Sequence, residues 1–233
     1  DDGGETAFVS WNNTTGTTQR VWWIQDGFSA GSGTYTLEWT VAPPAIFPLG
    51  TCAQNYPIPD DGCDGGSYMT ATFPISGQPN SLGTNVGLES VDLIITHTWR
   101  NDLHISLVAP NGQEILLVAD RGDDWNNFGA NGACTPFKLK DGGTPLTNLP
   151  AANNAVGTWA PEQPLAGFTG NPNGNWTLRV CDDTGADTGA LRYLQLNFLP
   201  IDCNGVLGGA AMPGTACNYN NACTSGDVLI PTC

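Results

Sequence analysis

The chain has 233 residues, 40% of them hydrophobic and only 12% charged, and its 22 acidic and 7 basic residues give a net charge of −15. A chain of this length can bury a core in one large or two modest domains. Its negative charge argues against nucleic acid and anionic lipid as partners, and no apolar run is long enough for membrane insertion. Because 30 Gly and 17 Pro residues leave few windows for a helix, we expect an all-β protein.

The first block, residues 1–42, is predicted to be a partial β-sandwich module. Between Thr34 and Val41, apolar side chains occupy every second position, which is the pattern of a half-buried strand. Two shorter apolar segments precede this strand. Three strands are too few for a stable sandwich of their own, so we expect this block to pack against another part of the protein.

A Pro-rich connector, residues 43–65, follows and contains the first two of eight cysteines. An even number of cysteines without a CxxC pair predicts four disulfides in an oxidising compartment. Proximity along the chain favours Cys52 with Cys63 as a stapled loop, and a bridge between Cys134 and Cys181 would tie two long loops together. The other pairings stay open. The eight cysteines are Cys52, Cys63, Cys134, Cys181, Cys203, Cys217, Cys223 and Cys233.

The longest β block, residues 66–199, is predicted to form a jelly-roll sandwich. Alternating apolar side chains run through residues 91–99, 103–107, 176–180 and 194–198, and residues 115–119 form a return strand after the turn at Pro110-Asn111-Gly112. Short strands joined by turns are typical of sandwiches and jelly rolls. The final block, residues 200–233, has few large apolar residues and four cysteines, so we expect a disulfide-crosslinked tail.

Two motifs in the middle block resemble the P domain of proprotein convertases, also called the P/Homo B domain. The first is VDLIITHTWRNDLHISLVAPNG, from Val91 to Gly112, and the second is NGNWTLRV, from Asn173 to Val180, followed by Asp182, Asp183, Asp187 and Gly189-Ala190-Leu191. The resemblance covers a little over half of the chain. Asn101 departs from the Gly that is usual there, and Cys134 and Cys181 are additional.

The flanking blocks carry resemblances of their own. Residues 26–37 are similar to part of a bacterial pre-peptidase C-terminal domain, and residues 202–233 resemble cysteine-rich linker repeats of surface proteins exported by type IX secretion. Together with the P-domain resemblance, they imply a multidomain extracellular or cell-surface protein. The chain opens without a signal peptide, so either the signal was removed or the chain is an internal fragment. The strand expected just after residue 5 and the final cysteine favour a fragment of something larger.

Calcium is the cofactor that the sequence predicts. Ca²⁺ is bound by six to eight oxygens, and Asp-rich turns supply both carboxylates and free carbonyls. The P-domain resemblance implies calcium near Asp102 and the loop from Asp182 to Asp187, and a further Asp cluster lies around Asp120. The predicted metal ligands are Asp102, Asp182, Asp183, Asp187, Asp120 and Asp123.

Catalytic patterns are weak, and we predict no catalytic residue. Residues 27–31 spell G-x-S-x-G, but a nucleophile elbow needs a following helix, and here a strand follows. His97 shares a strand face with apolar residues and is interpreted as a hydrogen-bonded core or edge residue. His104 points to the opposite face from Leu103 and is interpreted as a surface residue. Neither histidine has a matched Ser or Cys, so no triad is assembled.

The functional prediction is a non-catalytic structural or adhesion segment, stabilised by Ca²⁺ and disulfides. Its expected partners are other domains of the same parent protein, or copies of itself. One alternative is an accessory P domain of a secreted subtilisin-like protease. Another is a carbohydrate-binding module that binds a surface glycan, with Trp125 as the candidate exposed aromatic residue, whereas Trp99 is expected to be core.

Overall fold

The computed structural model describes residues 47–210, apart from the side chains of residues 64 and 65. These residues belong to the second of two units into which the chain divides, Asp1–Pro43 and Pro44–Cys233. The predicted module at 1–42 therefore lies outside the described residues, as does most of the predicted tail. No helix between residues 47 and 210 combines the length and hydropathy needed to cross a membrane.

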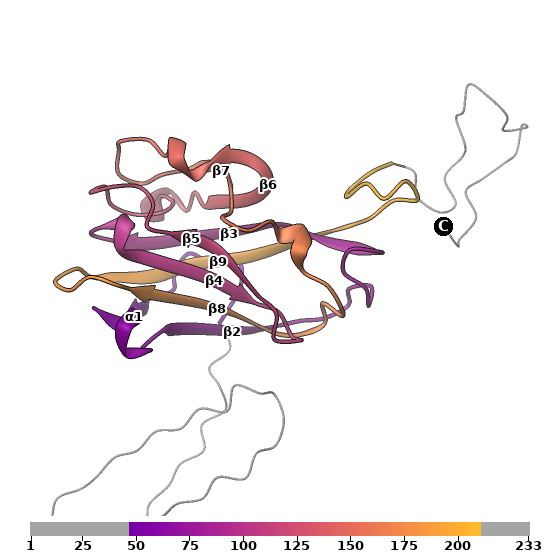
Figure 1. The fold of residues 1–233 in the computed structure, drawn as a ribbon, viewed down its shortest axis with the longest axis horizontal. Coiled ribbons are helices and arrows are strands. Elements are labelled where there is room, and N and C mark those ends of the chain that lie inside the picture. Colours follow the sequence, from indigo (N-terminus) through magenta and orange to yellow (C-terminus); the bar gives the residue numbers. More distant parts are fainter. Residues whose placement is uncertain (1–46, 211–233) are drawn as a thin grey trace, which may run out of the picture. The chain divides into compact units, whose positions relative to one another are not determined.

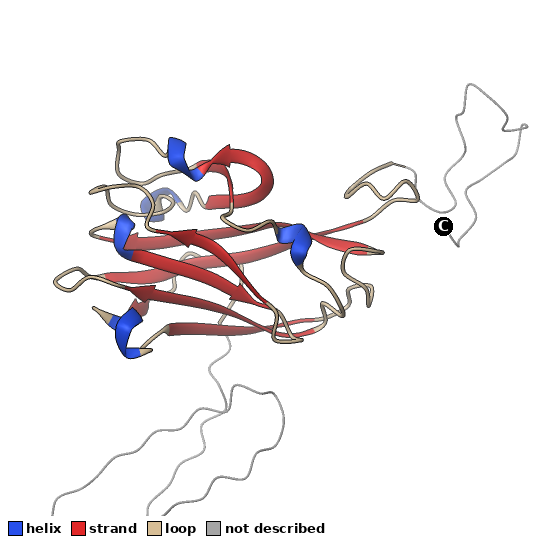
Figure 2. Ribbon diagram, in the orientation of Figure 1, coloured by secondary structure: helices blue, strands red, loops and turns tan. Residues whose placement is uncertain are grey.

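Two β-sheets form a sandwich, which confirms the all-β fold class (Figures 1 and 2). One sheet has five strands in the order β1-β9-β3-β6-β7, and the other has four in the order β2-β8-β4-β5. The strands are β1 (Tyr56–Ile58), β2 (Met69–Ile75), β3 (Val86–His97), β4 (Leu103–Val108), β5 (Glu114–Ala119), β6 (Phe137–Pro145), β7 (Gly157–Ala160), β8 (Gly174–Asp182) and β9 (Gly189–Pro200). The short helices are α1 (Gly62–Gly65), η1 (Arg100–Asp102), η2 (Asn131–Ala133), η3 (Leu146–Asn148) and η4 (Leu165–Gly167).

The core lies between the sheets and follows the alternation expected from the sequence. In β4, Leu103, Ile105 and Leu107 are completely buried, while the residues between them are partly exposed. Strand β8 buries Trp176 in the same way, and its indole Nε1 donates a hydrogen bond to the carbonyl oxygen of Pro172 at 2.7 Å. The indole therefore contributes a large apolar surface without leaving its polar group unsatisfied.

Strand β3 departs from the expected alternation at its C-terminal end. A register shift between Ile94 and Ile95 interrupts its pairing with β9, and both isoleucines are fully buried. The strand ends at His97, two residues before Trp99. The indole of Trp99 is 39% exposed, so its assignment to the core is wrong, because the strand periodicity that suggested it no longer applies there.

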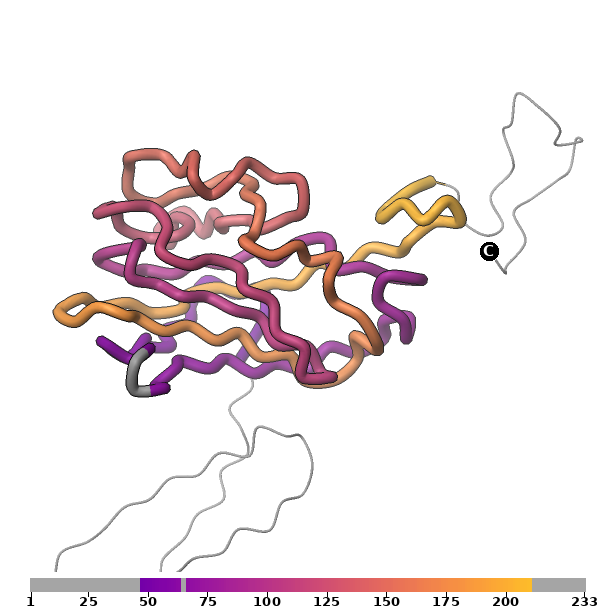
Figure 3. Tube along the Cα trace, viewed as in Figure 1, coloured from indigo at the N-terminus to yellow at the C-terminus, as the bar shows by residue number. Residues whose placement is uncertain are grey.

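The sandwich includes part of the segment assigned to the connector. Strand β1 pairs antiparallel with the first residues of β9, as can be traced in Figure 3. Phe47 is 1% exposed and packs against Tyr56, with 4.8 Å between the ring centroids. Apolar side chains before residue 66 thus contribute to the core.

The two disulfides in the described region join different cysteines from those expected. Cys52 pairs with Cys134, and Cys63 pairs with Cys181, with Cα–Cα distances of 5.8 and 5.1 Å. The predicted Cys52–Cys63 and Cys134–Cys181 bridges are therefore wrong. Strand β1 lies between Cys52 and Cys63 and, being extended at about 3.3 Å per residue, carries the two cysteines apart. Each instead meets a cysteine more than 80 residues further along the chain.

Candidate functional site

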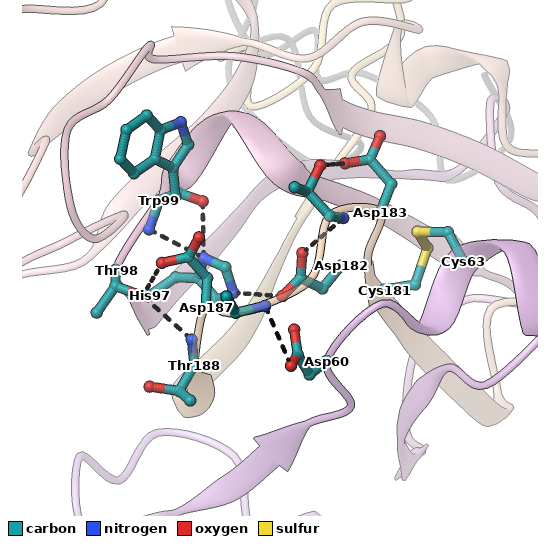
Figure 4. A network of polar contacts seen from close by, with 12 residues as sticks. Asp60, Cys63, His97, Thr98, Trp99, Cys181, Asp182, Asp183, Asp187 and Thr188 are labelled. Atoms are coloured by element: carbon teal, nitrogen blue, oxygen red, sulfur yellow. Dashed lines mark hydrogen bonds and ion pairs between the residues drawn. A yellow bond between two sulfur atoms is a disulfide. The ribbon is translucent and has the colours of Figure 1, made fainter.

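Polar side chains gather at one end of the sandwich, where several strands begin or end. Strand β8 runs antiparallel to β4, and β9 runs antiparallel to β3. The end of β3, helix η1, the end of β8 and the β8–β9 loop consequently lie together. The turn that carries α1 joins them, because Cys63 in α1 is bonded to Cys181 in β8 (Figure 4).

A buried histidine–aspartate pair forms the centre of this cluster. Nε2 of His97 lies 3.0 Å from Oδ2 of Asp182, and the two side chains are 0% and 1% exposed. Nδ1 of His97 lies 2.7 Å from the carbonyl oxygen of Trp99. Burial raises the pKa of Asp182 above its usual range, although the backbone N–H of Thr184 and His97 both act in the opposite direction. This pair joins the end of β3 to the end of β8.

Asp102 is the most perturbed acid among the described residues. Burial, followed by the negative charges of Asp182, Asp187 and Asp183, raises its pKa to about 6. The residue is only 6% exposed. Burial and neighbouring negative charge both disfavour the charged form of a carboxylate.

The β8–β9 loop adds further acidic oxygens to the cluster. The hydroxyl of Thr98 donates to Oδ1 of Asp187 at 2.5 Å, and Asp60, in the turn before α1, accepts a hydrogen bond from the backbone N–H of Ala186 at 3.2 Å. Figure 4 shows the carboxylates of Asp182 and Asp187 on the side of His97. We call Asp102, Asp182 and Asp187 the buried acidic cluster, after the first two, which are buried, while Asp187 is partly exposed.

The other three predicted metal ligands lie elsewhere. The carboxylate of Asp183 points away from that of Asp182 (Figure 4), and its Oδ2 lies 3.6 Å from Nε2 of His104. Asp120 lies on the same surface, with Oδ1 2.9 Å from that nitrogen. Asp123 interacts electrostatically with Arg100. The six predicted ligands are thus divided between at least two places, and their role as ligands stays a prediction.

The geometry does not provide a nucleophile within the described residues. Both ring nitrogens of His97 are occupied, by Asp182 and by the Trp99 carbonyl, so neither faces a serine, threonine or cysteine. The hydroxyl of Ser106 donates to Glu114 rather than to a histidine. A Ser–His–Asp arrangement requires a hydroxyl hydrogen-bonded to a histidine nitrogen, and no serine between residues 47 and 210 makes such a bond to His97 or His104. The G-x-S-x-G segment at 27–31 lies outside the described residues.

Two tryptophans are exposed near this end of the sandwich. Trp125 is 37% exposed, in keeping with the surface position expected for it, and Trp99 is 39% exposed. The backbone N–H of Arg100 donates to the carbonyl oxygen of Trp125 at 3.0 Å, so the loop that carries Trp125 lies beside the segment that carries Trp99. Glycan binding by Trp125 stays a prediction.

Sequence reasoning missed Arg100, which joins η1 to two loops. Its side chain is 0% exposed, and its two terminal nitrogens donate to four backbone carbonyl oxygens, at distances from 3.0 to 3.5 Å. Burial lowers the pKa of Arg100, and the charge of Asp123 opposes that change. The four carbonyl groups belong to Gly122, Asn127, Pro150 and Ala152. The arginine side chain therefore fixes the position of the turn that carries Asp102.

Comparison with known families and proteins supports the P-domain resemblance drawn from the sequence, and the resemblances of the two flanking blocks stay predictions. Residues 89–160 match the family model described as "Proprotein convertase P-domain". The match begins within β3 and ends with β7, so it includes Asp102 but not the β8–β9 loop. A curated relative, "Transglutaminase-activating metalloprotease" from Streptomyces mobaraensis, is 28% identical over 171 residues, which are 73% of this chain and 18% of the relative. The chain thus spans about a fifth of the length of that relative.

Two solved structures of a serine protease from Aeromonas sobria also overlap with this chain. The complex of the protease with its chaperone gives a TM-score of 0.29 at 15% identity, and the protease alone gives 0.28 at 16%. Each overlap covers 66% of this chain and 24% of the other.

Proposed function

We propose, from the P-domain match over residues 89–160, that the described module is a non-catalytic accessory domain of a larger secreted protein. Its role is mechanical: calcium and disulfides stiffen a β-sandwich that connects, spaces or supports neighbouring domains outside the cell. The two disulfides agree with an oxidising compartment such as the extracellular space. The observation that carries the proposal is Asp102, a residue only 6% exposed whose pKa is raised by burial and by the negative charges of Asp182, Asp187 and Asp183.

The chemistry of the buried acidic cluster suits calcium. Ca²⁺ is a hard cation that takes carboxylate and carbonyl oxygens, and these three side chains supply only oxygens. Burial, and after it the repulsion from neighbouring carboxylates, raises the pKa of Asp102, and a bound divalent cation would offset both effects. Asp102, Asp182 and Asp187 would hold the ion, and the ion would supply positive charge that links η1 to the β8–β9 loop.

The three carboxylates lie too far apart to hold one metal ion together in the present arrangement. Their ligand atoms do not all lie within 4.8 Å of one another, whereas those of one other group in the described region do. Calcium is therefore proposed to draw the β8–β9 loop towards η1, with water completing the coordination sphere.

Calcium should raise the melting temperature of the protein. At a calcium concentration about 100 times the Kd, a site selective for the folded state adds about 2.7 kcal/mol to the free energy of unfolding. For a domain of this size, that gain corresponds to an increase of about 5–10 °C. The measurement is differential scanning calorimetry of protein treated with EDTA, before and after CaCl₂ is added at constant ionic strength.

Magnesium at the same concentration is the control, because it demands a smaller and more regular octahedral site and raises the melting temperature less. Equal melting temperatures in EDTA and in calcium would contradict the proposal that calcium binds and stabilises the folded protein. That result would leave the non-catalytic accessory role to be judged separately.

Association with a protease is a second candidate, favoured by the curated relative. That relative is named as a metalloprotease, and this chain matches 18% of its length, which is the relation expected of an accessory domain. The test is to isolate the intact parent protein from its source and assay it for proteolysis. Cleavage activity in a polypeptide that contains residues 47–210 supports this role, and an inactive parent protein contradicts it.

A further inference from the structure

A second cluster of metal-binding side chains lies outside the buried acidic cluster. It consists of His104, Asp120 and Asp183, and we call it the His104 cluster. One candidate ligand atom from each side chain lies within 4.8 Å of the other two, and no other group of three does so between residues 47 and 210. All three side chains are accessible to solvent, with exposed fractions of 40%, 54% and 35%.

Strand pairing, rather than loop conformation alone, brings these residues together. Within the four-stranded sheet, β4 lies between β5 and β8, and His104 is opposite Ala119 on one side and Cys181 on the other. Asp120 directly follows Ala119, and Asp183 is two residues after Cys181. The Cys63–Cys181 disulfide further restrains the β8 side of the cluster.

A single imidazole nitrogen faces both carboxylates. Nε2 of His104 lies 2.9 Å from Oδ1 of Asp120 and 3.6 Å from Oδ2 of Asp183. The other oxygen of Asp183 accepts a hydrogen bond from the hydroxyl of Thr184 at 3.2 Å, which orients the carboxylate. An ion that replaced the hydrogen between Nε2 and Asp120 would have one nitrogen and two oxygen ligands from three segments of chain.

We propose that the His104 cluster binds a divalent transition metal, with zinc as the expected ion. Calcium takes oxygen ligands, so a site centred on an imidazole nitrogen is unsuited to it. Zinc binds imidazole nitrogen and carboxylate oxygen together, commonly with three protein ligands and one open position. Because the carboxylates of Asp182 and Asp183 point in different directions, this site and the buried acidic cluster share no side chain (Figure 4).

The open position would face solvent beside a shallow depression. This depression has a volume of about 290 Å³, and His104, Ser106, Glu114 and Gln163 contribute to its lining. Water, or one donor atom of a bound partner, can complete the coordination there. The bound metal would crosslink the start of β4, the end of β5 and the β8–β9 loop.

Isothermal titration of the full chain, without a His tag and with calcium present in excess, tests the proposal. We expect one equivalent of zinc to bind to the wild-type protein. His104→Ala should weaken binding by about 100-fold or more, since even residues that only orient a metal ligand cost 10–100-fold when replaced. Asp120→Asn should also weaken binding. Co²⁺ provides a second readout, because its visible absorption reports an ordered nitrogen and oxygen ligand set.

Asp124→Asn is the matched control for Asp120→Asn. It also removes one negative charge from the loop after β5, but Asp124 is not a member of the His104 cluster. It should leave zinc affinity within about twofold of wild type, since a single exposed charge contributes little. Equal zinc affinity in wild type and His104→Ala, or no zinc binding by the wild type, would overturn the proposal. A calcium-dependent rise in melting temperature that persists in His104→Ala would show that the two sites are separate.

Discussion

Arg100→Met is expected to destabilise the described module by about 3–5 kcal/mol. The guanidinium is fully buried and donates to the carbonyl oxygens of Gly122, Asn127, Pro150 and Ala152. Its loss removes all four hydrogen bonds, and although the first three oxygens also accept a backbone N–H, that of Ala152 is left without a donor among the described residues. Methionine fills much of the same volume, and the cost therefore reports lost hydrogen bonds rather than a cavity. Urea unfolding monitored by tryptophan fluorescence, with the disulfides intact, measures the change.

Two further variants separate the hydrogen-bond network from charge. Arg100→Lys retains the positive charge but cannot reach four carbonyl groups, because an ammonium lacks the planar fork of a guanidinium, so it should also be strongly destabilising. Arg121→Met, in the same loop, removes a partly exposed ion pair with Glu162 and should cost about 1 kcal/mol or less. The role given to Arg100 would be contradicted if Arg100→Met lowered the free energy of unfolding by no more than Arg121→Met does.

Asp102→Asn is expected to stabilise the calcium-free protein at pH 7 by about 1–3 kcal/mol. The pKa of Asp102 rises from 3.8 to about 6 on folding, because of burial and the negative charges around it. The folded state therefore binds a proton more tightly than the unfolded state does. In EDTA, the contribution of Asp102 to the free energy of unfolding is therefore greatest below about pH 4. It decreases as the pH rises towards 6 and stays at its lowest value above that.

The asparagine amide in this variant carries no charge to be desolvated, so the variant should lose this part of the pH dependence. The same variant should lose most of the stabilisation by calcium, because an amide oxygen is a weaker ligand than a carboxylate. Urea unfolding at pH 4, 5, 6 and 7 in EDTA, repeated at pH 7 in calcium, measures both effects. Asp124→Asn serves as the control. A wild-type protein that gains stability between pH 4 and 6 by the same amount as Asp102→Asn would contradict this account.

The sequence predicted those parts of the fold that depend on local alternation. In β4 and β8, every second residue is apolar, and both strands bury those side chains as expected. The prediction failed where the pattern meets an irregularity. A register shift at Ile94 and the end of β3 at His97 leave Trp99 exposed, and alternation alone contains no signal for a strand end.

Features that depend on distant parts of the chain were harder to predict. Proximity along the chain suggested Cys52 with Cys63, but β1 separates them, and each cysteine pairs across the sandwich. The contacts of Arg100 lie in loops whose approach no motif specifies. A signal for the His104 cluster did exist, because antiparallel β4 and β5 place the start of one beside the end of the other. His104 and Asp120 could have been paired on that basis.

The most direct test of the central claim is a crystal structure of the protein grown in calcium, with the ion identified by anomalous scattering. We expect an ion bound by carboxylate oxygens of Asp102, Asp182 and Asp187 at about 2.3–2.6 Å, with the β8–β9 loop drawn towards η1. The contradictory result is a well-ordered cluster, at saturating calcium, in which these carboxylates contact only water or protein donors.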